Sequence, residues 1–258
     1  MTPSFPGATG LTVLDVYDWV APDGLRGGSA HVHLASTEGY LVLSGDGELQ
    51  TLSERGYAAT PLRPGDCLWF TPGTIHRLVN GGGLRLAVVM QNAGLPEHGD
   101  AVLTFPPDVL ADPARYARAA SLEAAPETAG SPAERARRRA SLAVEGYLEL
   151  RDLVAGQGPS ALEGFFAAAL RLTTERVPDW RERWHAGALA TAELTGAHLD
   201  EIAAAVPAHL AAAGVWRIPA LGQDASAAGE SPDVEDTRGY GMCGRLTTYP
   251  ATRATRVG

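Results

Sequence analysis

The fold of this protein is decided by two stretches, HVHLASTEGYLVLSG at residues 31–45 and PGTIHRLVN at residues 72–80. Successive side chains of a β-strand point to opposite faces, so His31 and His33 are predicted to lie side by side on one face of a strand. Glu38 opens the next strand-like run, and His76 follows a turn on a third strand-like segment. Three imidazoles and one carboxylate on neighbouring strands predict a metal site.

The same residues resemble the two sequence motifs of the cupin superfamily. The first motif, HxH, four residues, E, six residues and G, is matched by His31, His33, Glu38 and Gly45. The second motif, a PxG-like turn, two residues, H, three residues and N, is matched by Gly73, His76 and Asn80. Two turn positions depart from the motifs, since Leu25 stands where the first has its leading glycine and Thr71 where the second has its proline.

The resemblance covers roughly residues 11–90 and implies a small antiparallel cupin-type barrel, or jelly roll, with one divalent metal ion. By resemblance the metal ligands are His31, His33, Glu38 and His76. Such ligands suit iron, manganese, nickel, cobalt or zinc, and they leave coordination positions open for substrate, water or oxygen. Because many cupins activate dioxygen at Fe(II), we expect iron and a dioxygenase-type oxidation of a small molecule in the barrel. The alternatives are a metal-dependent sugar or polyol isomerase or epimerase, and a non-catalytic small-molecule-binding cupin.

One further side chain is predicted to face the metal. Tyr40 shares strand parity with Glu38, so its phenol would point into the barrel and bond a substrate or a water molecule. The alternative is that Tyr40 only fills the barrel. Arg85 interrupts an apolar strand and would either bind a carboxylate substrate or lie on the surface. Residues 67–71 are expected to form a buried strand, in which parity does not decide whether the pair Cys67 and Trp69 faces inward.

Composition excludes several classes of function. The net charge of −9 argues against nucleic acid and anionic membranes as partners, because both require a basic surface. The sequence contains no lysine, which excludes Schiff-base and phosphate-loop chemistry on that residue. Two cysteines make no disulfide framework, and no stretch reaches the length of a membrane span. We therefore expect a cytoplasmic protein. We also expect it to bind a small-molecule substrate and to form a homodimer.

The chain is predicted to have three parts: a barrel at residues 1–105, an α-helical region at 106–221, and a tail at 222–258. Within the barrel, tight hairpin turns are expected at residues 45–47 and 80–83, where glycines cluster. In the tail, residues 222–235 are small, acidic and expected to be flexible, whereas residues 240–249 could return as an edge strand.

The helical region is marked by capping signals. Asp112 and Ser131 each precede a proline at the first helical position, and Ser160 repeats a capping pattern. These signals predict helices at residues 113–124, 132–156, 160–177, 179–196 and 198–213. The apolar stripes of these helices predict that Phe105 and part of the pair Phe165 and Phe166 are buried, with the helices packed on the barrel or on that of a second subunit. Four further histidines, at 98, 185, 198 and 209, lack ligand spacing and are expected to be structural.

Overall fold

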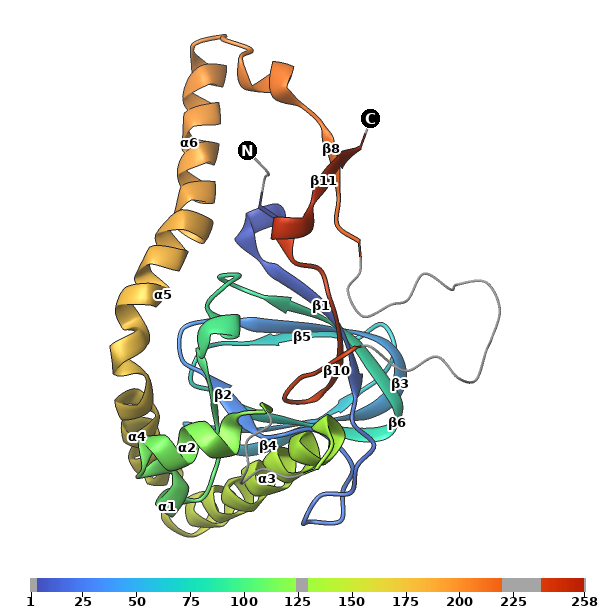
Figure 1. Ribbon diagram of the computed structural model, residues 1–258, viewed down its shortest axis with the longest axis vertical. Coiled ribbons are helices and arrows are strands. Elements are labelled where there is room, and N and C mark those ends of the chain that lie inside the picture. The colour runs from blue at the N-terminus through green and yellow to red at the C-terminus, as the bar shows by residue number, and fades with distance from the viewer. Residues whose placement is uncertain (1–3, 124–129, 220–237, 258) are drawn as a thin grey trace.

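The computed structural model, which describes residues 4–123, 130–219 and 238–257, has an antiparallel barrel followed by helices (Figure 1). The strands of the barrel sheet are β1 (Gly10–Val16), β2 (His31–His33), β3 (Glu38–Ser53), β4 (Gly56–Leu62), β5 (Cys67–Phe70), β6 (Ile75–Met90), β7 (Ala101–Leu103), β9 (Gly239–Tyr240) and β10 (Gly244–Thr248). The main path is β4-β3-β6-β1-β10-β9, with β2 paired to β6 and β7, and β5 to β3. This architecture confirms the predicted combination of a jelly-roll barrel and a helical region.

The two glycine clusters do not form hairpin turns, and that prediction is wrong. Both lie inside long strands, since β3 and β6 each continue for 16 residues, and the pairing of β3 with β6 shifts register between Val42 and Gly47. The reason is close approach of backbones. A Cβ at Gly45 would lie 2.2 Å from the carbonyl carbon of Gly83, and one at Gly47 would lie 2.3 Å from the oxygen of Val79. These glycines let the paired strands bend sharply at a corner of the barrel.

The C-terminal part of the chain completes the barrel. Strand β10 pairs with β1 from Thr12↔Thr248 to Val16↔Gly244, and β9 forms the end of the sheet beyond it. A strand in residues 240–249 was expected, and it joins the sheet more than 150 residues after the end of β6. The predicted flexible segment at residues 222–235 lies outside the described residues.

Strand β5 is not buried, contrary to the sequence prediction. Cys67 is exposed and Trp69 is 73% exposed, whereas Leu68 and Phe70 face the barrel interior. Arg85 also points outward, with its guanidinium 3.6 Å from the carboxylate of Asp15. The outer face of the sheet therefore carries Cys67, Trp69 and Arg85, and none of them is available to a ligand inside the barrel.

The helices are α1 (Pro107–Leu110), α2 (Pro113–Ala120), α3 (Pro132–Gln157), α4 (Glu163–Thr173), α5 (Val177–Trp184) and α6 (Ala190–Ala203). Two of the three predicted caps are present: Asp112 accepts hydrogen bonds from the backbone of Ala114 and Arg115, and Ser131 forms a capping box with Glu134. The predicted cap at Ser160 is wrong, because Ser160 lies inside a 3₁₀ turn (Pro159–Leu162) and α4 begins at Glu163 without a side-chain cap. Helix α1 was not predicted, and α2 ends four residues early. As predicted, the helix after Ser160 ends before Pro178, since α4 ends at Thr173. Pro178 itself lies in the first turn of α5, where a missing N–H costs nothing.

The predicted break near residue 197 is also absent. Helix α5 continues through a π-helical turn, His185–Leu189, into α6, which ends before Pro207. Beyond it come a short 3₁₀ turn (His209–Ala212) and a small hairpin of β8 (Val215–Arg217) with β11 (Thr255–Val257). None of the helices in the described part of the chain is long and apolar enough to cross a membrane.

Helix α3 packs directly on the barrel. Its glycine at 146 lies so close to the chain before α1 that a Cβ would meet the carbonyl oxygen of Thr104 at 2.2 Å. The Thr104 hydroxyl donates to the carbonyls of Ala30 and Ala143, 3.1 and 2.7 Å away, which joins the histidine strand to α3. One hydrophobic core runs from the sheet into the helices and includes Phe105 and Phe165, both buried as predicted, with Phe166 packed against it.

Candidate metal centre

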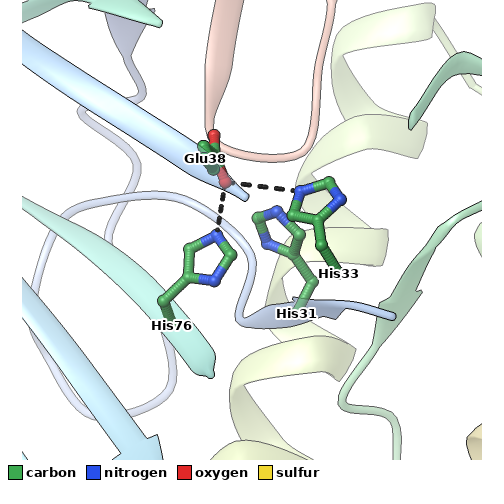
Figure 2. A group of neighbouring side chains, drawn as sticks. All are labelled: His31, His33, Glu38 and His76. Carbon is green, nitrogen blue, oxygen red and sulfur yellow. Dashed lines mark ion pairs between the residues drawn. The ribbon is translucent and has the colours of Figure 1, made fainter. Parts of the chain in front are cut away.

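The four predicted ligands meet inside the barrel. His31 and His33 stand on β2, Glu38 begins β3, and His76 lies on β6 directly opposite His31 in the register. One donor atom from each residue lies within 4.8 Å of the others, and the residues are 0–7% exposed. Figure 2 shows the three imidazoles and the carboxylate pointing toward one another. Pairing of β2 and β3 with the same strand, β6, brings the ligands together from segments up to 45 residues apart.

Each imidazole is oriented through its Nδ1 atom. Nδ1 of His31 lies 3.2 Å from the carbonyl oxygen of Ser29, and Nδ1 of His76 lies 3.1 Å from that of Thr74. Nδ1 of His33 lies 3.3 Å from Oδ2 of Asp100. An oxygen acceptor requires the proton on Nδ1, so each neutral ring carries its lone pair on Nε2. In their neutral forms the three rings thus turn the lone pair of Nε2 toward the centre.

The donor atoms that face the centre lie close together, but two of them lack a hydrogen-bond partner. Oε2 of Glu38 lies 3.1 Å from Nε2 of His76 and 3.3 Å from Nε2 of His33. Even so, Oε2 of Glu38 and Nε2 of His76 have no partner with hydrogen-bond geometry among the described residues. Buried polar atoms in proteins are nearly always paired, and an exception often marks a ligand site. A cation between these atoms would satisfy them, so the donor set fits a metal ion.

The local electrostatics favour the ligand forms of two of these groups. Burial alone would raise the pKa of Glu38, but its contacts with His33 and His76 hold the pKa well below the ordinary value, so the carboxylate is ionised. Burial and the neighbouring imidazoles hold the pKa of His31 well below the usual range, which keeps that ring neutral. Burial would also lower the pKa of His33, but Asp100 and Glu38 raise it to about 9.

Asp100 supports this centre, although no sequence pattern indicated it. Its side chain is completely buried, and Oδ1 accepts hydrogen bonds from the backbone N–H groups of Leu34 and Ala35 at 2.9 and 2.7 Å. Its other oxygen holds His33. Asp100 thus sets both the turn after β2 and the orientation of a ligand. No motif or spacing connects residue 100 with residue 33, because only the pairing of β2 with β7 brings them together.

Tyr40 lies inside the barrel, as its parity predicted. It is 1% exposed, and its hydroxyl has no hydrogen-bond partner among the described residues. Burial, and then the charge of Glu38, raises the pKa of Tyr40 well above its ordinary value, so the phenol stays protonated. Phe70 links it to the ligands, with ring centroids 5.4 Å from Tyr40 and 4.2 Å from His76.

The C-terminal hairpin reaches the same interior. The carbonyl of Met242 accepts hydrogen bonds from the N–H and hydroxyl of Ser29, at 3.0 and 2.8 Å. The thiol of Cys243 lies 3.7 Å from the carbonyl oxygen of Ser29, which also orients His31. Figure 2 shows this loop of the chain, in pale red, beside Glu38. Cys243 is therefore part of the wall around the centre, a role that a lone cysteine far along the sequence did not reveal.

A buried cluster of three histidines and one glutamate that could hold a metal ion lies inside an antiparallel barrel, and the class of protein is therefore a jelly-roll barrel with a candidate metal site. Residues 19–90 match the family model for the Cupin domain, which supports the assignment of this barrel to the cupin superfamily. The resemblance seen in the two motifs is thus confirmed. The matched residues end at β6, so β7, β10 and all the helices lie outside them.

Comparison with solved structures gives similar barrels at low identity. They include a double-stranded β-helix protein from Klebsiella pneumoniae (21% identity, 32% of this chain and 66% of that one, TM-score 0.27). Others are a predicted oxalate decarboxylase from Thermotoga maritima (20%, 32% and 64%, 0.25) and the Streptomyces nucleoside dehydratase Pac13 (18%, 32% and 58%, 0.26). The matches thus span less than two thirds of each structure, and TM-scores this low carry no argument about substrate. No match was found among curated proteins.

Proposed function

We propose that this protein is a metal-dependent enzyme that oxidises a small molecule inside the barrel with dioxygen, at a centre formed by His31, His33, Glu38 and His76. The observation that carries the proposal is the convergence of three imidazoles and one carboxylate, of which Oε2 of Glu38 and Nε2 of His76 have no hydrogen-bond partner among the described residues. A divalent ion such as Fe(II) on these four donors would supply two open coordination positions for oxygen and substrate.

The lining of the barrel supports oxidation over the alternative, isomerisation of a sugar or polyol. The core around the centre is aliphatic and aromatic, and it includes Leu78, Leu86, Val88 and Phe70. Two arginines of β6 point away from this interior, because Arg77 pairs with Asp23 on the opposite face and Arg85 lies outside. A polyhydroxylated substrate needs many polar partners. The lining therefore favours a small, largely apolar substrate that is held by the metal and oriented by few polar groups.

Tyr40 is the side chain that we propose to contact the substrate. Its hydroxyl is buried and protonated, and it has no hydrogen-bond partner in the described part of the chain, so it can donate a hydrogen bond to a polar atom of a molecule at the centre. Glu38 stays ionised and holds the ligand position beside it. Burial of all four ligands excludes bulk water, which strengthens each electrostatic interaction at the centre.

The decisive experiment is elemental analysis of protein purified without oxygen, combined with oxygen-electrode measurements on a panel of small apolar and carboxylic substrates. Stoichiometric iron with substrate-dependent oxygen consumption is the expected result. Nickel, zinc or manganese without oxygen consumption would overturn the oxidation in favour of the isomerase or epimerase. If no metal binds even after reconstitution, the protein would instead be a non-catalytic small-molecule-binding cupin.

A further inference from the structure

Helix α6 has no buried residue, although the structure describes all of its 14 positions. Leu194, Leu199 and Ile202 are 57–61% exposed. Figure 1 shows α5 and α6 rising along one side of the molecule and past the end of the barrel, before the chain returns through the hairpin of β8 and β11. The chain's own barrel thus leaves this helix uncovered.

The exposed side chains of α6 and its continuation form a pattern that normally faces a core. Leu199 and Ile202 are spaced i and i+3 on α6, as on one face of a helix, and Val206 follows three residues beyond the end of α6. Further apolar side chains follow on the segment that leads to β8. We call the whole set the arm surface: Leu194, Leu199, Ile202, Val206, Leu210, Val215 and Trp216, all 38–66% exposed. Apolar surface of this extent on a soluble chain usually marks an interaction site.

A second apolar surface lies on the outside of the barrel, across β5, β3 and β6. Its members, which we call the sheet surface, are Leu41, Leu43, Trp69 and Val89, all 41–73% exposed. The register makes them neighbours, since Gly39 lies between Trp69 and Val89, and Leu41 lies opposite Cys67. Trp69 is the most exposed of them, and aromatic side chains are enriched at the centres of protein interfaces.

Charge favours a protein partner for the arm surface. Helix α6 carries Glu193, Asp200 and Glu201, and its sequence contains no arginine or lysine. A helix that lies on an anionic membrane needs basic residues on its polar face, and nucleic acid requires a basic surface as well. Both are therefore poor occupants of the α6 part of this surface, whereas Arg217 and Arg256 lie beside Trp216 in the hairpin of β8 and β11.

We propose that a second copy of this chain covers both surfaces in a two-fold symmetric dimer. Both apolar surfaces belong to the same chain, so a symmetric pair buries all of them at equal stoichiometry. With roughly 200 Å² per free side chain, these eleven residues expose on the order of 1,000 Å² per chain, whereas a stable interface needs about 800 Å² from each partner. The surface is thus large enough for a stable dimer without any other component. This inference does not depend on the proposed reaction.

The test begins with the mass of the full-length protein in solution, measured by sedimentation velocity from about 0.5 to 50 μM. The expected result is twice the mass of the chain. Ile202→Glu on the arm surface and Trp69→Glu on the sheet surface should each raise the dissociation constant at least tenfold. Leu170→Glu is the matched control, because Leu170 is 57% exposed on α4 and belongs to neither surface. All three positions are exposed, so circular dichroism should show that each variant remains folded.

Cys67 supplies an independent readout of the sheet surface. It is one of two cysteines, and the other, Cys243, is buried. Its reaction with a thiol reagent should be at least tenfold faster in Ile202→Glu than in the wild type, although the substitution is on the arm. A wild-type monomer at 50 μM would overturn the proposal. So would a dimer that withstands either substitution, or one whose Cys67 reacts equally fast in the wild type and in Ile202→Glu.

Discussion

The carboxylate of Asp100 lies 3.3 Å from Nδ1 of His33, although 67 residues separate them in the sequence. Through this contact a residue outside both sequence motifs determines which nitrogen of His33 faces the centre. Oδ1 of the same carboxylate holds the backbone of Leu34 and Ala35, so the contact is itself held in place.

Asp100→Asn is therefore expected to weaken metal binding about 10- to 100-fold while the barrel still folds. An amide nitrogen facing Nδ1 would favour the tautomer that places the proton on Nε2, where it blocks ligation. Competition with a chromophoric chelator measures the change. Asp66→Asn, in the exposed turn where Asp66 accepts from the backbone of Arg63, is the control and should bind metal normally. Equal affinities in the two variants would contradict this role for Asp100.

Loss of one ligand should remove the metal without unfolding the barrel. His76→Ala deletes a completely buried donor, whereas the surrounding core is aliphatic and remains packed. We expect less than one tenth of the wild-type metal content after reconstitution and dialysis, with an unchanged circular dichroism spectrum. His185→Ala, which changes an exposed histidine on the π-helical turn, should retain full metal content. Stoichiometric metal in His76→Ala would refute the ligand assignment.

A comparison of Tyr40 with Tyr147 can distinguish a role in packing from a role at the centre. Both are buried, and within the described residues both hydroxyls lack a partner. An unpaired buried hydroxyl costs about 1–3 kcal/mol, so Tyr→Phe at either position should stabilise the metal-free protein by roughly 1 kcal/mol in urea denaturation. Only Tyr40→Phe should also alter turnover or the affinity of a small ligand at the centre. If the two variants behave alike in both assays, Tyr40 is a packing residue.

The ion pair of Arg77 and Asp23 should contribute strongly to stability. Nη1 of Arg77 lies 2.5 Å from Oδ2 of Asp23, and the guanidinium is completely buried. Asp23→Asn leaves that charge without its partner, which should cost about 3 kcal/mol in the free energy of unfolding. Asp108→Asn, which breaks the exposed pair with Arg115, is the control and should cost less than about 1 kcal/mol.

The effect of Asp23→Asn should depend on pH in a defined direction. Burial alone would raise the pKa of Asp23, but the hydrogen bond and charge of Arg77 outweigh it and lower the pKa. A carboxyl whose pKa is lower in the folded than in the unfolded state stabilises the folded protein. This stabilisation is complete above the unfolded-state pKa of about 3.9, and it is lost as the pH falls through the folded-state pKa. The difference from the wild type should thus be constant between about pH 5 and pH 7 and shrink below about pH 4. A difference that grows on acidification would contradict this.

The C-terminal hairpin should separate from the barrel when its contact with Gly28 is blocked. A Cβ at position 28 would lie 2.4 Å from Cα of Cys243, so Gly28→Ala must displace the hairpin. We expect a loss of about 1–3 kcal/mol and faster reaction of Cys243 with a thiol reagent. Gly82→Ala, whose new atom would have no neighbour closer than 3.6 Å, should leave Cys243 protected. An unreactive Cys243 in folded Gly28→Ala would show that the hairpin does not depend on this contact.

The sequence alone determined what local patterns can encode. Strand parity and turn residues predicted the strand that carries His31 and His33, and capping residues predicted the starts of α2 and α3. Ligand spacing predicted the cluster that the structure brings together. These features depend on a few neighbouring residues, and the tertiary structure left the preferences of those residues unchanged.

Only the tertiary structure decided the features that depend on contacts with distant parts of the chain. The local sequence around Gly45 and Gly47 predicts a turn, but close contact with β6 places both glycines at a bend inside one strand. Asp100 and Cys243 reach the centre only because β7 and β10 pair with strands from the beginning of the chain. The exposure of Trp69 likewise follows from the face that β5 turns outward. No short sequence pattern predicts contacts between distant segments, because these contacts depend on how the whole sheet packs and buries its apolar side chains.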